Sequence, residues 1–112
     1  MKLIKSFQLI AVIFFNVNYV ISQALEDCAQ SLSIFAEFAK VKNYDSAFEP
    51  WMMVRENCSK INPAIYSYGE RILKDKIKKT SGDEKEFFKK DLLKLYDEWI
   101  ENFPKQRNKT II

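Results

Sequence analysis

Acidic side chains are the main candidates for general acid–base chemistry in this sequence. The chain contains no histidine, no glycine-rich phosphate loop and no serine in a nucleophile-elbow motif. The adjacent pairs Glu26-Asp27 and Asp83-Glu84 stand at expected helix starts, where carboxylates interact favourably with the helix dipole. We therefore expect that the protein is not an enzyme and binds no cofactor.

The two cysteines, Cys28 and Cys58, are the other groups with a characteristic chemistry. Two thiolates without any histidine do not supply the four ligands of a usual zinc site, and a redox-active pair is more often spaced C-x-x-C. We expect no metal site. Whether the two thiols pair with each other depends on the compartment and on the fold.

The first 24 residues have the composition of a secretory signal. MKLIK is a short basic start, the stretch 7–21 is mostly apolar, and Ser22-Gln23-Ala24 offers small residues for cleavage. Asn16 and Asn18 cut the apolar run short of the roughly 20 residues that span a bilayer. We expect residues 1–24 to be cleaved, which leaves no stable membrane span; an uncleaved anchor is the alternative.

The remaining chain is nearly balanced in charge. Without Lys2 and Lys5, 16 of the 18 basic residues are left against 15 acidic ones, which gives no support to nucleic-acid binding. A basic run from Arg71 to Lys79 is most simply the solvated face of a helix. Residues 25–104 are enough for one small domain, and 105–112 form a polar tail.

The scarcity of helix breakers predicts an all-α fold. The chain has only two glycines and three prolines, and its apolar residues recur every three or four positions. This periodicity predicts helices near 25–41, 45–58, 63–79 and 82–103. Asn62-Pro63 has the pattern of a cap followed by a first helical proline, and Ser81 with Glu84 has that of a capping box.

Pro50 is the one proline that falls within an expected helix. In a helix interior it would lose a hydrogen bond and clash with a carbonyl, at a cost of roughly 3 kcal/mol. If Ser46 caps the helix and Glu49 reaches back to it, Pro50 lies in the first turn and costs less. We expect this later start, or a kink at Pro50.

Short connections make neighbouring helices antiparallel, which predicts two helical hairpins at 25–58 and 62–104. The start of the first helix then lies beside the end of the second, so Cys28 and Cys58 fall at the same end. Because the signal directs the chain to an oxidising compartment, we expect a disulfide between them. Closing this loop could stabilise the domain by about 3 kcal/mol.

The two hairpins also resemble each other. A shift of 34 residues aligns their first helices and a shift of 45 aligns their second helices, which an insertion of 11 residues near 78–85 explains. The chain resembles the tetratricopeptide repeat (TPR) family in three elements: Ile65-x2-Tyr68-Gly69-x2-Ile72, Ala47-x3-Trp51 and Pro104. It departs from the family at Phe35 and Leu92, where small residues are usual. An unrelated four-helix bundle is the alternative.

The resemblance implies two stacked hairpins in a short α-solenoid, similar to secreted or periplasmic TPR proteins of Gram-negative bacteria. Such repeats bind protein or peptide partners on a concave face lined by the first helix of each hairpin. Carried over to this chain, that face would comprise Ala36, Lys40, Tyr66, Glu70 and Lys74, with Tyr66 as an exposed contact; packing of Tyr66 against a neighbouring helix is the alternative. Since at least three repeats are usually needed, we expect further repeats downstream or association with another copy or a partner.

Two functions are consistent with these features. The first is a protein-interaction scaffold of the cell envelope. The second is a small secreted carrier or effector whose helices enclose an apolar ligand, since the chain has sixteen aromatic residues, several of them between Phe87 and Phe103. A fluorescent fatty-acid probe would bind saturably to a carrier and would not bind to a scaffold.

Overall fold

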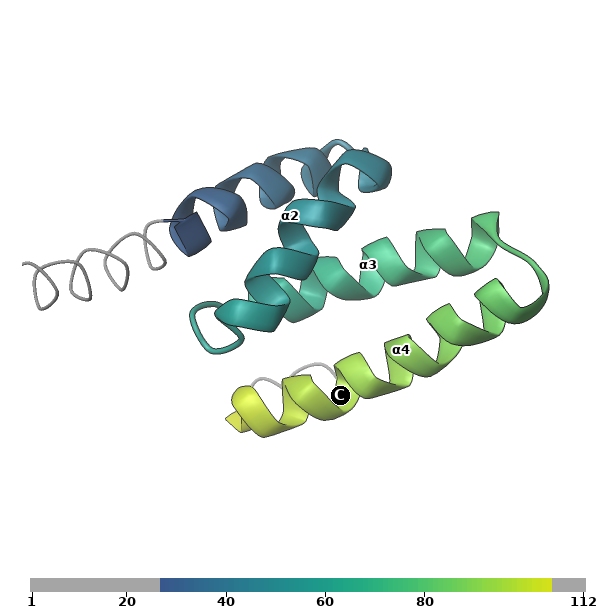
Figure 1. Ribbon diagram of the computed structural model, residues 1–112. Coiled ribbons are helices and arrows are strands. Elements are labelled where there is room, and N and C mark those ends of the chain that lie inside the picture. The colour runs from purple at the N-terminus through teal and green to yellow at the C-terminus, as the bar shows by residue number, and fades with distance from the viewer. Residues whose placement is uncertain (1–26, 106–112) are drawn as a thin grey trace, which may run out of the picture.

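The described part of the chain, residues 27–105 of a computed structural model, is built from helices and contains no strand. The first helix occupies residues 27–40, and α2 (Tyr44–Asn57), α3 (Ala64–Lys79) and α4 (Gly82–Asn102) follow it (Figure 1). The all-α prediction is confirmed, and the helix bounds agree with the predicted ranges to within a residue where they are described. The predicted signal at 1–24 and the tail beyond residue 105 lie outside this part.

The first helix ends in a tight reversal at Lys42. The Lys42 N–H donates to the carbonyl of Ala39 at 3.0 Å, and the Asn43 N–H donates to that of Phe38 at 2.9 Å. Lys42 has a φ of 63°, the left-handed conformation that usually ends a helix in this way. The chain therefore turns back within three residues and enters α2.

The start of α2 contradicts the later helix start predicted near Pro50, whereas the alternative, a kink at Pro50, stays a prediction. The helix begins at Tyr44, and its cap is Asn43, whose side chain accepts a hydrogen bond from the Ser46 N–H at 3.3 Å. Ser46 is therefore not the cap, and Pro50 lies inside the helix rather than in its first turn. Proline donates no backbone hydrogen bond to Ser46, but Ser46 is exposed, so water can satisfy its carbonyl.

The starts of α3 and α4 differ from the predicted caps in detail. The Asn62 side chain accepts from the Ala64 N–H at 2.8 Å, and Pro63 stands directly before α3. Ser81 precedes α4 as predicted, but its side chain makes no capping hydrogen bond, so the capping box is wrong. Gly82 has a φ of +62°, which a residue without a Cβ adopts readily in the reversal between α3 and α4.

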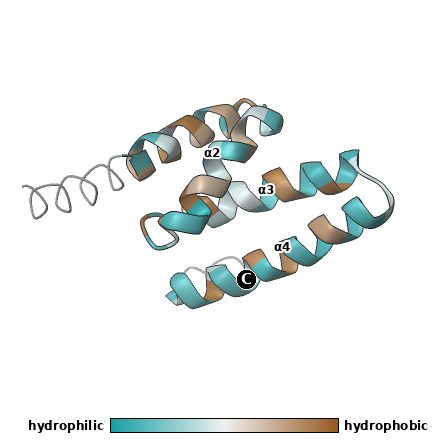
Figure 2. Ribbon diagram, in the orientation of Figure 1, coloured by the Kyte–Doolittle hydropathy of each residue, from teal (hydrophilic) through white to brown (hydrophobic). Residues whose placement is uncertain are grey.

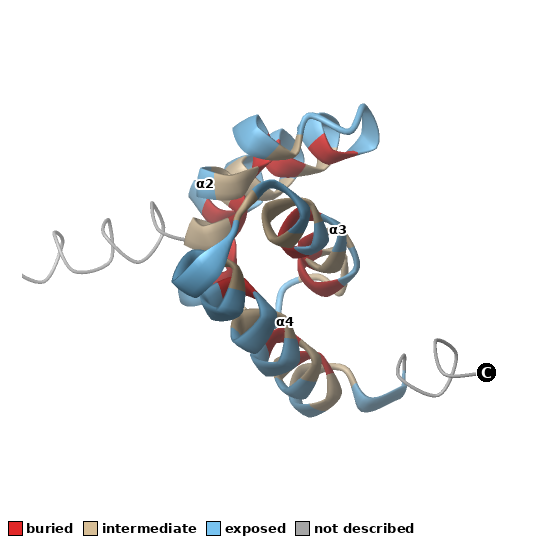
Figure 3. Cartoon of the chain, turned by 90° about the vertical axis from the view of Figure 1, so that its right-hand side faces the viewer, coloured by how far each residue is buried: buried red, intermediate tan, exposed pale blue. Residues whose placement is uncertain are grey.

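The core forms where the apolar stripes of the helices meet around α3. Helix α3 packs against both α2 and α4, and apolar segments alternate with polar ones along each helix (Figure 2). The buried residues lie on the sides of the helices that face one another (Figure 3). The members of this core are Phe35, Ala39, Ala47, Trp51, Val54, Ile65, Tyr66, Ile72, Leu73, Phe88, Leu95 and Trp99.

Trp51 of α2 packs directly against α3. Its indole Nε1 donates a hydrogen bond to the Ile65 carbonyl at 2.7 Å, and the side chain is fully buried. The ring lies against Gly69: a Cβ on that residue would come within 2.6 Å of Trp51 Cζ2. Gly69 is therefore required for space, because any side chain there would push α3 away from the indole.

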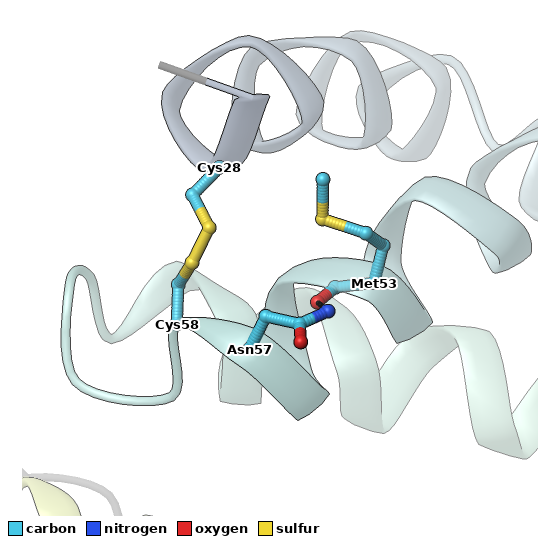
Figure 4. Close-up of a disulfide and its surroundings, with 4 residues drawn as sticks. All are labelled: Cys28, Met53, Asn57 and Cys58. Atoms are coloured by element: carbon cyan, nitrogen blue, oxygen red, sulfur yellow. Dashed lines mark hydrogen bonds between the residues drawn. A yellow bond between two sulfur atoms is a disulfide. The ribbon is translucent and has the colours of Figure 1, made fainter. Parts of the chain in front are cut away.

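Cys28 and Cys58 form a disulfide that joins the first helix to the end of α2 (Figure 4). Their Cα atoms are 6.3 Å apart, within the usual range for a disulfide, and Cys28 is buried. The predicted pairing is confirmed. The bridge connects residues 30 positions apart and holds the first helix against the core at the end opposite to the Lys42 reversal.

No helix within residues 27–105 has the length and apolar character needed to cross a membrane.

Replacing Gly69 by alanine should destabilise the protein. The added methyl group overlaps the Trp51 ring, and overpacking of this kind costs about 1–3 kcal/mol, more than alanine gains over glycine in helix propensity. We expect the free energy of unfolding, measured by urea denaturation, to fall by about 2 kcal/mol. The exposed Ser67→Ala on the same helix is the control and should change it by less than about 0.5 kcal/mol. Equal stability of Gly69→Ala and the wild type would contradict the close contact.

Removing the disulfide should lower the free energy of unfolding by more than Gly69→Ala does. A variant with both Cys28→Ser and Cys58→Ser should lose about 3 kcal/mol of stability, because the unfolded chain regains the freedom of the open loop. The wild type unfolded in the presence of dithiothreitol should match the double variant. If dithiothreitol leaves the unfolding midpoint of the wild type unchanged, the disulfide contributes little to the stability of the fold.

Candidate binding groove

The candidate site is a groove between α2 and α4 with a volume of about 580 Å³. Arg55 of α2 reaches across the groove to Asp91 and Glu98 of α4. Seven of the groove's thirteen lining residues are charged and four are large and apolar, so it can present both kinds of contact to a ligand. The lining comprises Phe48, Met52, Arg55, Glu56, Ser59, Lys60, Phe87, Phe88, Asp91, Lys94, Glu98, Glu101 and Asn102.

Arg55 bridges the two walls of this groove. Its Nη1 and Nη2 donate to both oxygens of Asp91, each at 2.9 Å, and its Nε donates to Glu98 Oε2 at 2.9 Å. The guanidinium also lies 5.2 Å from the centre of the Trp51 ring. Because planar, bidentate pairs of this kind are strongly directional, Arg55 sets the spacing of α2 and α4.

The electrostatics of Arg55 follow from its burial and its partners. Only 6% of its side chain is exposed, against 16% for Asp91 and 29% for Glu98. Burial by itself lowers the pKa of Arg55, but its hydrogen bonds to Asp91 and Glu98 and their negative charges outweigh burial, so the pKa lies above its ordinary value. The groove thus has a permanently charged residue in its floor.

One end of the groove is aromatic. Phe48 meets Phe88 edge-on with ring centres 6.3 Å apart, and Phe88 meets Phe87 at 5.4 Å. Phe87 is 63% exposed, whereas Phe88 is buried in the core. Met52 is half-buried beside them. An exposed phenylalanine on a buried aromatic support is a suitable anchor for an apolar group of a ligand.

The other end of the groove is polar and held by hydrogen bonds. Asn102 Nδ2 donates to the Tyr66 hydroxyl at 2.6 Å, and that hydroxyl donates to the Ser59 carbonyl at 2.7 Å. The Tyr66 ring stacks on Trp99 with centres 6.2 Å apart. Burial raises the pKa of Tyr66, so the hydroxyl stays neutral and continues to donate. This chain ties the loop after α2 to the end of α4.

The predicted exposure of Tyr66 is wrong. Its side chain is fully buried, because its position on α3 faces the aromatic residues of α4 rather than solvent. The periodicity of α3 alone did not reveal which neighbour that face would meet. Tyr66 instead supports the polar end of the groove from within.

The other residues of the predicted concave face do not line this groove. Lys40 is exposed and pairs with Glu37 at 3.2 Å, and Ala36 is half-buried against the core. Glu70 and Lys74 pair with each other at 2.7 Å, and this hydrogen bond raises the pKa of Lys74. Nothing in their contacts tests the predicted partner-binding role.

Sequence reasoning missed the residues that form the groove. Arg55 looked like one more polar residue of α2, and its pairing with Asp91 and Glu98 joins positions 36 and 43 residues apart. A signal was present at Phe87-Phe88, because adjacent residues on a helix point in different directions. A pair of large apolar residues side by side is therefore a place where one of them can be exposed or line a site.

The groove is suited to non-covalent binding. Within residues 27–105 no group of three or more histidine, cysteine, aspartate or glutamate side chains could hold a metal ion. Three of the five N–H groups of Arg55 donate to its two carboxylates, and Phe87 offers only apolar surface. What the lining can supply is shape, an aromatic contact and charge.

Removing Arg55 should leave two carboxylates facing each other. Breaking a buried pair on one side costs about 3–5 kcal/mol, and the partial exposure of Glu98 places the expected loss for Arg55→Ala near about 3 kcal/mol at pH 7. The loss is measured by urea denaturation. Lys89→Ala, which breaks an exposed pair with Glu86, is the control and should cost less than about 1 kcal/mol. A small effect at Arg55 would show that it does not hold the walls.

Comparisons with protein-family models, with curated proteins and with solved structures give no match. The likeness to TPR proteins is therefore a likeness of sequence pattern.

Proposed function

We propose that the protein is a non-catalytic scaffold for protein–protein interaction, and that the groove between α2 and α4 holds a segment of its partner. The observation that carries this proposal is the exposed Phe87 ring at the apolar end of a groove of about 580 Å³. Large aromatic side chains that stand in a depression are the usual anchors of protein interfaces.

The walls of the groove are suited to this role because they are pre-organised. Arg55 holds α2 to α4 through three hydrogen bonds, and the Tyr66 hydroxyl holds its polar end. A site whose walls are already in place loses little conformational freedom on binding. A partner segment would therefore meet a formed surface.

We also propose that the helices form two TPR-like hairpins stacked in register. Two contacts support this arrangement: the Phe35 ring meets the Tyr68 ring edge-on at 6.3 Å, and Trp51 packs on Gly69. Both place a residue of the first hairpin on α3, the first helix of the second. In a stack of this kind the groove belongs to the face made by the second helices, α2 and α4, and the concave face with Ala36, Lys40, Glu70 and Lys74 stays a further prediction.

The proposed location is the cell envelope or the exterior. The signal-like composition of residues 1–24 and the Cys28–Cys58 disulfide both fit an oxidising compartment. Association with a second copy, or with further repeats of the same kind, is consistent with this role.

A carrier of an apolar ligand would need a different site. The groove is open, and more than half of its lining residues are charged, which disfavours burial of a hydrocarbon chain. The fatty-acid probe therefore serves as a control: saturable binding to the monomer would favour the carrier.

The proposed function can be tested by selecting peptides from a random 12-residue library displayed on phage. We expect selected peptides to bind the wild type, and Phe87→Ser to weaken binding by at least about tenfold, because it removes the anchor. Leu93→Ser is the matched control, since Leu93 is equally exposed on α4 (65%) but does not line the groove. It should leave binding unchanged.

Failure to select any peptide whose binding depends on Phe87 would overturn the proposal. Equal losses of peptide affinity in Phe87→Ser and Leu93→Ser would also overturn the proposal, because the peptides would then not bind in the groove.

A further inference from the structure

We propose that the groove recognises segments that carry a lysine or arginine at a set distance from their apolar anchor. This inference rests on the proposed function and names the class of partner. The anchor meets Phe87 at one end, and the cationic group meets Glu98 toward the other.

The floor of the groove carries one uncompensated negative charge. Arg55 supplies one positive charge, and it is bound by two carboxylates, Asp91 and Glu98. All three side chains are largely shielded from solvent, with at most 29% exposed, so their charges are screened less than those of surface residues. One negative charge is therefore left over where screening is weak.

The rim does not compensate this charge. The remaining charged lining residues are Glu56, Lys60, Lys94 and Glu101, two of each sign, and all four are exposed. Their charges cancel in sum and are screened by water. The one excess negative charge of the groove is therefore carried by the group of Arg55, Asp91 and Glu98, called here the Arg55 cluster.

Glu98 is the member of this cluster that can accept a ligand. Both oxygens of Asp91 are used by the Arg55 guanidinium, whereas Glu98 accepts from Arg55 through Oε2 alone. Its Oε1 has no hydrogen-bond partner among residues 27–105, and Glu98 lines the groove. An ammonium or guanidinium group of a ligand would donate a charge-assisted hydrogen bond to Glu98 Oε1.

The positions of the two contacts set the spacing in the ligand. Phe87 and Glu98 both face the groove from α4, and eleven residues of helix span about 16 Å. An extended peptide covers this distance in about five residues. We therefore expect an aromatic or large aliphatic residue and a lysine or arginine about five positions apart.

The test compares the peptides selected on the wild type with those selected on Glu98→Gln. The glutamine can still accept the Arg55 hydrogen bond, so the walls keep their spacing while the excess charge is lost. On the wild type, peptides with both features should be enriched, and replacing their cationic residue by norleucine should weaken binding about tenfold. On Glu98→Gln the same replacement should have no effect. Glu86→Gln, an exposed residue of α4 outside the groove, is the control and should behave as the wild type.

The outcomes separate this inference from the proposed function. Peptides that need Phe87 but no cationic residue would overturn the inference and leave the scaffold function standing. Cationic peptides that bind Phe87→Ser as well as the wild type would show attraction to the acidic surface alone, which also overturns it. If no peptide depends on Phe87, both proposals fail. The norleucine comparison is made on wild-type protein, so it shows whether binding needs the cationic residue of the peptide even if Glu98→Gln does not fold.

Discussion

The contact of the Trp51 indole with α3 is the constraint on which the rest of the structure depends. The ring fits only because residue 69 is glycine, and its N–H is satisfied only by the Ile65 carbonyl one turn earlier. These two requirements set both the distance and the register of α2 on α3. Arg55, one turn after Trp51 and stacked on it, is thereby aimed across the groove toward α4. A shift of α2 would move Arg55 away from Asp91 and Glu98.

Three kinds of interaction then keep a small helical protein in one arrangement. Apolar burial around α3 supplies most of the driving force, since a helix is stable mainly through the stripe that it buries. The Cys28–Cys58 bridge holds the first helix, which otherwise contacts the core through few large side chains such as Phe35. The buried polar groups of Arg55 and Tyr66 make the packing specific. Their hydrogen bonds form in this arrangement of the helices and would be lost if one helix shifted along another.

Periodicity predicted the helices and their bounds well, but the capping groups were predicted less well. Apolar residues every three or four positions are enough to place each helix, because only one face of it is buried. The ends depend on single hydrogen bonds, and here Asn43 rather than Ser46 caps α2 while Ser81 caps α4 without its side chain. The groove could not be predicted in the same way. It needs the pairing of Arg55 with residues far along the chain, and that pairing follows from the packing of α2 and α4 on α3.

The sequence by itself determined the all-helical fold and the approximate helix bounds, because both depend on local spacing. It led us to expect the pairing of Cys28 with Cys58, but that pairing also depends on how the first two helices meet. Only the tertiary structure decided that Tyr66 is buried, that Phe87 rather than Phe88 is exposed, and that Arg55 closes a groove. The physical reason is that spacing along a helix tells which residues share a face. It does not tell which other helix that face will meet.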